Sequence, residues 1–211
     1  MGVEAGRADH VRPPRPGSSF PRSASPMQRF VLLLLLAAGL LPAASAQTRA
    51  RDEVRPSPNA VVGQTIGTTD VTVTYGRPSV RGRAVFGADT TFLAPYGQLW
   101  RLGANEATTI TVSSDVRVEG QPLAAGTYAL FAIPGATEWT LVFNRTAEQW
   151  GAYRYDASQD ALRVTVAAET DPDDDVEEML DIEFDDVTPT STVLTMEWER
   201  VSVPVRIETA G

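Results

Sequence analysis

Apolar and polar residues alternate in short runs from about residue 59 to residue 207. The pattern is clearest in Leu162-Arg163-Val164-Thr165-Val166 and in Leu180-Asp181-Ile182-Glu183-Phe184. Antiparallel sheets with one face on the core and the other in water produce this alternation. Ten segments follow it, and we expect each to be a strand: 61–66, 71–75, 108–112, 116–118, 127–133, 139–143, 162–166, 180–184, 193–198 and 201–207.

Turn residues separate these segments at intervals typical of all-β domains, and no stretch has helical periodicity. The sequence therefore predicts an all-β fold, an antiparallel β-sandwich of about nine or ten strands, either jelly-roll-like or immunoglobulin-like. A closed β-barrel is the alternative. Residues 76–98 hold no alternating run, and we expect them to form one long loop, a feature that is often functional.

The N-terminal part differs in composition from the rest. Met27-Gln28-Arg29 precedes an apolar run over residues 30–41, and Ala44-Ser45-Ala46 supplies small residues at a cleavage site. We expect a signal peptide over 27–46, since the run is too short for a membrane span. Residues 1–26 are expected to be upstream sequence from an early start codon. Residues 47–58 should form a disordered lead-in to a single β domain over 59–208.

Composition restricts the chemistry. The net charge of −9 argues against nucleic acid as a partner. The chain has no Cys and no Lys, and its one His is His10, ahead of the predicted signal peptide. After cleavage the protein would have no disulfide, no imidazole or thiolate nucleophile and no Schiff-base lysine. Carboxylates, arginines, tyrosines and hydroxyls remain, and no cofactor is expected.

Polar residues gather in and beside the stretch from Trp100 to Ile110. Arginines bind carboxylates and phosphates through two donors, and Asn and Glu can bond hydroxyl groups. A small polar or anionic ligand would fit such a group. The alternative is a buried ion pair of Glu106 with Arg101 or Arg81 that fastens the long loop. The residues concerned are Arg77, Arg81, Arg83, Arg101, Asn105 and Glu106.

Aromatic residues follow the same stretch. Trp150 and Tyr153 lie in a loop beside Gly151, where a sugar ring could stack on them, so we add both to the ligand site. The alternative is that the tryptophans pack into the core, which we favour for Trp139 and Trp198 because both lie inside predicted strands.

Two carboxylate hypotheses remain. Asp171, Asp173 and Asp175 could hold Ca²⁺, but their spacing matches no EF-hand loop and acidic turns are common on acidic surfaces. We therefore expect no metal site. Glu106 would be the acid or base of a glycan-directed hydrolase or lyase, yet its possible partners, Asp89, Glu148 and Asp156, cannot be placed beside it.

Four motifs in order resemble one family. They are Tyr75-Gly76-Arg77-Pro78-Ser79-Val80-Arg81-Gly82-Arg83, the stretch from Trp100 to Ile110, Gly126-Thr127-Tyr128-Ala129-Leu130-Phe131 and Gln149-Trp150-Gly151-Ala152-Tyr153. They resemble the secreted bacterial domain-of-unknown-function family 2911 over about residues 59–207. The resemblance implies an extracytoplasmic β domain and no particular activity.

Together these observations predict a periplasmic or secreted β-sandwich, cleaved near Ala46, that binds a small polar, anionic or glycan-like ligand or a cell-envelope partner. We lean against an enzyme. A hydrolase or lyase that uses Glu106 and a purely structural interaction module are the alternatives. The sequence indicates no oligomeric state. The expected ligand-binding residues are Arg77, Arg81, Arg101, Asn105, Glu106, Trp150 and Tyr153.

Overall fold

The computed structural model describes residues 1–2, 53–173 and 175–210. The chain divides into two units, Met1–Ser45 and Ala46–Gly211, and the fold below is that of the second. The predicted upstream segment, apart from Met1 and Gly2, lies outside the described residues, as do the predicted signal peptide and residues 47–52. No helix of the described residues is both long enough and apolar enough to span a membrane.

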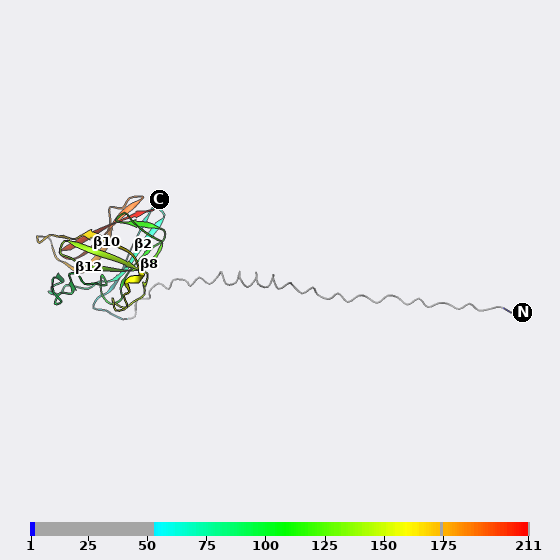
Figure 1. Ribbon diagram of the computed structural model, residues 1–211, viewed down its shortest axis with the longest axis horizontal. Helices are drawn as coiled ribbons and strands as arrows, with labels where there is room; N and C mark the ends of the chain where they lie inside the picture. Colours follow the sequence, from blue (N-terminus) through cyan, green and yellow to red (C-terminus); the bar gives the residue numbers. More distant parts are fainter. Residues whose placement is uncertain (3–52, 174, 211) are drawn as a thin grey trace. The chain divides into compact units, whose positions relative to one another are not determined.

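Two antiparallel sheets form a β-sandwich (Figure 1). The first has the strand order β1-β2-β5-β8-β9-β10. Its strands are β1 (Asn59–Ile66), β2 (Thr69–Gly76), β5 (Thr108–Val112), β8 (Gly126–Ile133), β9 (Glu138–Asn144) and β10 (Asp160–Ala167). The fold class predicted from the sequence is confirmed, and the alternative of a closed barrel is wrong because each sheet ends in edge strands.

The second sheet has the order β12-β13-β14-β6-β7, and β11 also pairs with β14. Its strands are β6 (Val116–Val118), β7 (Gln121–Leu123), β11 (Glu169–Thr170), β12 (Glu177–Asp185), β13 (Ser191–Glu199) and β14 (Val201–Thr209). Inside the long loop, β3 (Phe86–Gly87) and β4 (Ala94–Pro95) form a short parallel pair. A single 3₁₀ turn, Ala157–Gln159, is the one helical element of the described residues.

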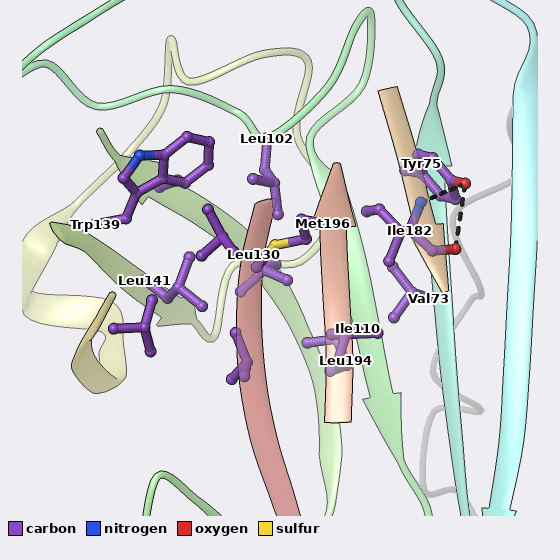
Figure 2. Packing of buried hydrophobic residues seen from close by; sticks show 14 of the residues in the cluster. Val73, Tyr75, Leu102, Ile110, Leu130, Trp139, Leu141, Ile182, Leu194 and Met196 are labelled. Atoms are coloured by element: carbon purple, nitrogen blue, oxygen red, sulfur yellow. Dashed lines mark hydrogen bonds between the residues drawn. The ribbon is translucent and has the colours of Figure 1, made fainter. Parts of the chain in front are cut away.

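The main core lies between the two sheets because their inward-facing positions are apolar at every second residue. In β2, Val71 and Val73 are fully buried while Asp70 is exposed, as period-two alternation requires. Figure 2 shows Leu102, from the loop before β5, beside Leu130 of β8 and Met196 of β13. The loop that precedes β5 is therefore anchored in the core by an apolar side chain.

A smaller apolar cluster covers the other face of the first sheet. Ala107, Ala129, Phe131 and Val142 are fully buried there. Residues of the loop between β9 and β10 pack over them, and the Tyr155 ring meets the Phe131 ring edge-on at 5.4 Å between centroids. The central parts of β8 and β9 are thus buried on both faces, which explains their runs of consecutive apolar residues.

Tyr75 joins the sheets by a polar contact inside the core. Its hydroxyl donates to the Asp181 carboxylate at 2.8 Å. It also accepts from the backbone N–H of Ile182 at 3.1 Å (Figure 2). Burial, and then the hydrogen bond to Asp181, raises the pKa of Tyr75 above its usual 10. The folded protein therefore favours the protonated hydroxyl.

Replacing Tyr75 with phenylalanine should lower the free energy of unfolding by about 1 kcal/mol at pH 8, because the hydrogen bonds of the hydroxyl are lost. Since the tyrosine pKa is raised by folding, its stabilisation is complete below pH 10 and declines as the pH rises above 10. Relative to the variant, wild type should lose about 1.4 kcal/mol between pH 8 and pH 11 in urea titrations, so the order of the two stabilities should reverse. A constant difference over this range would contradict the assignment.

Candidate functional site

The stretch from Trp100 to Ile110 enters β5 through a tight coil of backbone. Leu102 and Asn105 adopt positive φ angles of 49° and 66°, a conformation that costs most residues about 1 kcal/mol. Leu102 is fixed there by complete burial, and the Thr108 hydroxyl donates to its carbonyl oxygen. The coil turns the side chains of Arg101, Asn105 and Glu106 away from the core that holds Leu102.

The loop after β9 runs antiparallel to this coil. Ala107 N–H donates to the Gln149 carbonyl and Gly151 N–H donates to the Asn105 carbonyl, both at 3.0 Å. Glu106 and Trp150 are bridge partners in this short ladder. Segments that lie more than forty residues apart in sequence are therefore adjacent in the fold, as the predicted site requires.

The loop after β9 carries two exposed aromatic rings. The side chains of Trp150 and Tyr153 are 54% and 85% exposed, which is unusual for large rings. Gly151, with a φ of 61°, lies between them, and a Cβ there would be 3.2 Å from the Tyr153 ring and 3.8 Å from Cδ of Arg101. The glycine thus lets Arg101 and Tyr153 approach one another.

Arg101 has an unusual environment for a cation. Its Nε atom is buried and has no hydrogen-bond acceptor, and no carboxylate of the described part of the chain forms an ion pair with it. Burial lowers the pKa of its guanidinium, although arginine remains protonated at neutral pH. A buried N–H without an acceptor costs about 1–3 kcal/mol.

Glu106 pairs with a residue that the sequence analysis did not assign. Nη1 of Arg55 lies 3.0 Å and 2.7 Å from the two carboxylate oxygens of Glu106, and both side chains are largely buried. The guanidinium carbon of Arg55 also lies 6.0 Å from the centre of the Trp150 ring. Glu106 is therefore in a buried ion pair, but its partner is neither Arg101 nor Arg81.

The other predicted arginines contact backbone carbonyls. Arg77 donates from Nε to the Leu180 carbonyl at 2.8 Å, and its Nη2 is 3.3 Å from the Asp181 carboxylate. Arg81 donates from Nη2 to the Pro56 carbonyl, and Arg83 donates to the carbonyls of Val80 and Ser79. These contacts secure the long loop and the segment before β1.

The last six residues of the predicted disordered lead-in, 53–58, lie against Asn105 and Arg77. The Ser57 carbonyl accepts from Nδ2 of Asn105 at 3.3 Å, and the Pro58 carbonyl accepts from Arg77 N–H at 2.8 Å. The difference from the sequence-based expectation has a simple cause. Polar groups of distant motifs bind the carbonyls of this segment, and such contacts leave no periodic pattern in the segment itself.

Asp89 and Asp156, two of the carboxylates considered for acid–base catalysis, have lowered pKa values, unlike a general acid. Hydrogen bonds from the Thr91 hydroxyl and N–H lower the pKa of Asp89. The pKa of Asp156 is lowered by hydrogen bonds from Ser158, whose N–H this residue caps. A general acid at neutral pH needs a raised pKa, so neither residue has the environment of one.

The acidic turn shows local contacts. Asp171 accepts from the backbone N–H of Asp173. Within residues 53–173 and 175–210, no group of three or more acidic residues is arranged to hold a metal ion, and that includes Asp171, Asp173 and Asp175.

A comparison with protein families gives the assignment. The family described as "Protein of unknown function (DUF2911)" matches residues 57–207. The chain belongs to the DUF2911 family. The matched region of this DUF2911 chain contains all seven predicted ligand-binding residues but not Arg55. No curated protein and no solved structure matches the chain.

Proposed function

We propose that this DUF2911 domain binds a small anionic ligand through Arg101, with Trp150 and Tyr153 as neighbouring aromatic surfaces. The observation that supports it is the Arg101 guanidinium, which is partly buried and has no acceptor for its Nε donor. Buried charges in proteins are normally paired, because desolvation is otherwise uncompensated. A carboxylate or phosphate of a ligand would supply the missing acceptor in two-point geometry.

The aromatic side chains suggest the rest of the ligand. Trp150 and Tyr153 are exposed rings beside the cation, and a flat or ring-shaped ligand could stack on either of them. An acidic sugar combines a ring with a carboxylate, so we take glucuronate as the first probe. The predicted signal peptide supports a periplasmic or secreted location, where glycans of the cell envelope are available.

The function is non-enzymatic in this proposal. Glu106, the one carboxylate inside the motif-rich region, has both oxygens on Nη1 of Arg55. Its contacts resemble those of a structural ion pair, and the environments of Asp89 and Asp156 give no general acid to accompany it. A hydrolase or lyase that uses Glu106 is therefore the second candidate.

Replacing Arg101 with methionine should abolish binding without destabilising the protein, because the buried cation has no partner to lose. Glucuronate at one hundred times its Kd should add about 2.7 kcal/mol to the stability of wild type. That corresponds to a Tm rise of about 5–10 °C. The Arg101→Met variant should show no rise in thermal-shift assays.

The matched control is Arg117→Met. Arg117 is an exposed arginine that donates to the Gly120 carbonyl in another part of the fold, so this variant should keep the ligand response. Galacturonate, succinate and inorganic phosphate extend the panel, and glucose serves as the uncharged comparison. Absence of a Tm rise in wild type with every anion, or an equal rise in Arg101→Met, would refute the proposal.

A further inference from the structure

A short segment, which we call the strap (Glu53–Pro58), lies outside every strand and rests on side chains of three family motifs. The surface beneath it, called here the strap-binding surface, interacts with one side chain and three consecutive carbonyls of the strap. Its members are Arg77, Arg81, Asn105, Glu106 and Trp150.

The side-chain contact is selective for a cation. Arg55 approaches a carboxylate, Glu106, and an aromatic ring, Trp150, and its own side chain is only 13% exposed. A carboxylate and an aromatic face together favour a guanidinium over a neutral group. This end of the strap-binding surface therefore recognises arginine.

The remaining contacts do not depend on side-chain identity. The carbonyls of Pro56, Ser57 and Pro58 accept in turn from Arg81 Nη2 at 3.2 Å, Asn105 Nδ2 at 3.3 Å and Arg77 N–H at 2.8 Å. These donors bind the strap through its backbone, although the strap bends at Pro56 and Ser57, and backbone contacts of this kind are a common means of peptide recognition. Two prolines restrict the backbone of the strap and bring no N–H group that needs an acceptor.

The strap can separate from the domain at small cost to the core. None of its residues belongs to either apolar cluster, and Val54 is 99% exposed. A hollow of about 400 Å³ lies between the strap and the start of β1, bordered by Val54, Arg55 and Val61 among others. The hydrogen bonds from Arg81 and Asn105 are at the long end of the normal range.

The family match gives a further argument. It begins at Ser57, so the arginine that fills the cation site lies outside the matched region, whereas all five members of the strap-binding surface lie within it. The family match therefore includes the surface and the last two strap residues, Ser57 and Pro58, but not the arginine that occupies the cation site.

We propose that the strap-binding surface is a docking site for an arginine-bearing segment of another protein, and that the strap covers it in the free protein. A tethered strap acts at an effective concentration of about millimolar, so a partner must compete with it. The partner segment needs one arginine followed by three residues whose backbone can bend as the strap does at Pro56 and Ser57. This proposal does not depend on the anion site at Arg101.

The test uses an acetylated, amidated peptide with the sequence of residues 53–59, titrated calorimetrically into the full chain. The Arg55→Ala variant lacks the arginine of its own strap that competes with the peptide. It should therefore bind the peptide at least tenfold more tightly than wild type. The peptide with alanine in place of its arginine should not bind. The double variant Arg55→Ala/Glu106→Gln should lose binding, whereas the exposed-carboxylate control Arg55→Ala/Glu138→Gln should keep it.

Three results of these experiments would overturn the docking proposal. Failure of folded Arg55→Ala to bind at several millimolar peptide, or binding that survives Glu106→Gln, would overturn the proposal. Concentration-dependent dimerisation of wild type that Arg55→Ala abolishes would assign the surface to a second copy of the chain and also overturn it. If Arg55→Ala does not fold, excess peptide should displace the strap of wild type and change the NMR chemical shifts of the Val54 and Ser57 amides, and unchanged shifts would reject the docking site.

Discussion

Gly76→Ala is expected to lower the free energy of unfolding by about 3 kcal/mol, because no space exists for a methyl group at this position. A Cβ on Gly76 would lie 2.4 Å from the Ala104 carbonyl oxygen and 3.2 Å from the carbonyl carbon. Both atoms belong to backbone, which cannot rotate aside as a side chain can. Ala104 N–H also donates to the Gly76 carbonyl at 3.2 Å, so the clash would separate the end of β2 from the coil that carries Arg101 and Glu106.

The control for this variant is Gly63→Ala in the neighbouring strand β1. There the nearest atoms to an added Cβ are 3.5 Å and 3.6 Å away, which is ordinary contact. Alanine in a strand interior should be neutral or stabilising by about 0.5 kcal/mol relative to glycine. Urea unfolding of both variants measures the difference. Equal stabilities would mean that the coil and the end of β2 are not in the close contact described.

Trp100→Ala is expected to cost about 3–5 kcal/mol, the range for removing a large buried ring. The Trp100 ring stacks on Trp198 at 5.6 Å between centroids and meets Trp139 edge-on at 5.9 Å. Its backbone exchanges two hydrogen bonds with Ala132 of β8, so the ring is held firmly inside the cluster. Truncation would leave a large cavity at the beginning of the coil.

Trp150→Ala provides the comparison for Trp100→Ala. Trp150 is 54% exposed, and surface truncations of this kind cost less than about 1 kcal/mol. Urea titrations should therefore separate the two variants by about 2 kcal/mol or more. A Trp150→Ala cost as large as that of Trp100→Ala would show that Trp150 is a core residue and would remove the reason to regard it as a binding surface.

Ten of the strands could be predicted from the sequence because each has at least one apolar position that faces the core. β12, for example, alternates Leu180 and Ile182, both buried, with more exposed acidic residues. Residues 53–173 and 175–210 contain fourteen strands, and the additional four are β3, β4, β7 and β11, of two or three residues each. The two-residue strands contain no full period, and β7 reads Gln121-Pro122-Leu123, whereas the equally short β6 alternates as Val116-Arg117-Val118.

The site was predictable only in part. The coil and the loop that carries Trp150 do meet, as the motifs suggested, but the partner of Glu106 is Arg55, fifty-one residues upstream. Arg55 lies in a polar segment with two prolines, and nothing in its composition distinguishes it from Arg49 or Arg51. Nor does the sequence show that Arg101 lacks an ion-pair partner, since ion pairing depends on distances between loops and not on spacing along the chain.

The small apolar cluster on the outer face of the first sheet has a consequence for binding. Tyr155 packs on Phe131 and donates to the Asp160 carboxylate at 2.7 Å, and the Asn144 amide secures the same loop through the Asp156 carbonyl at 2.9 Å. The loop that presents Trp150 and Tyr153 is thus immobilised before any ligand arrives. A ligand that stacks on these rings does not have to order the loop, so most of the entropy loss that weakens binding to mobile loops is avoided.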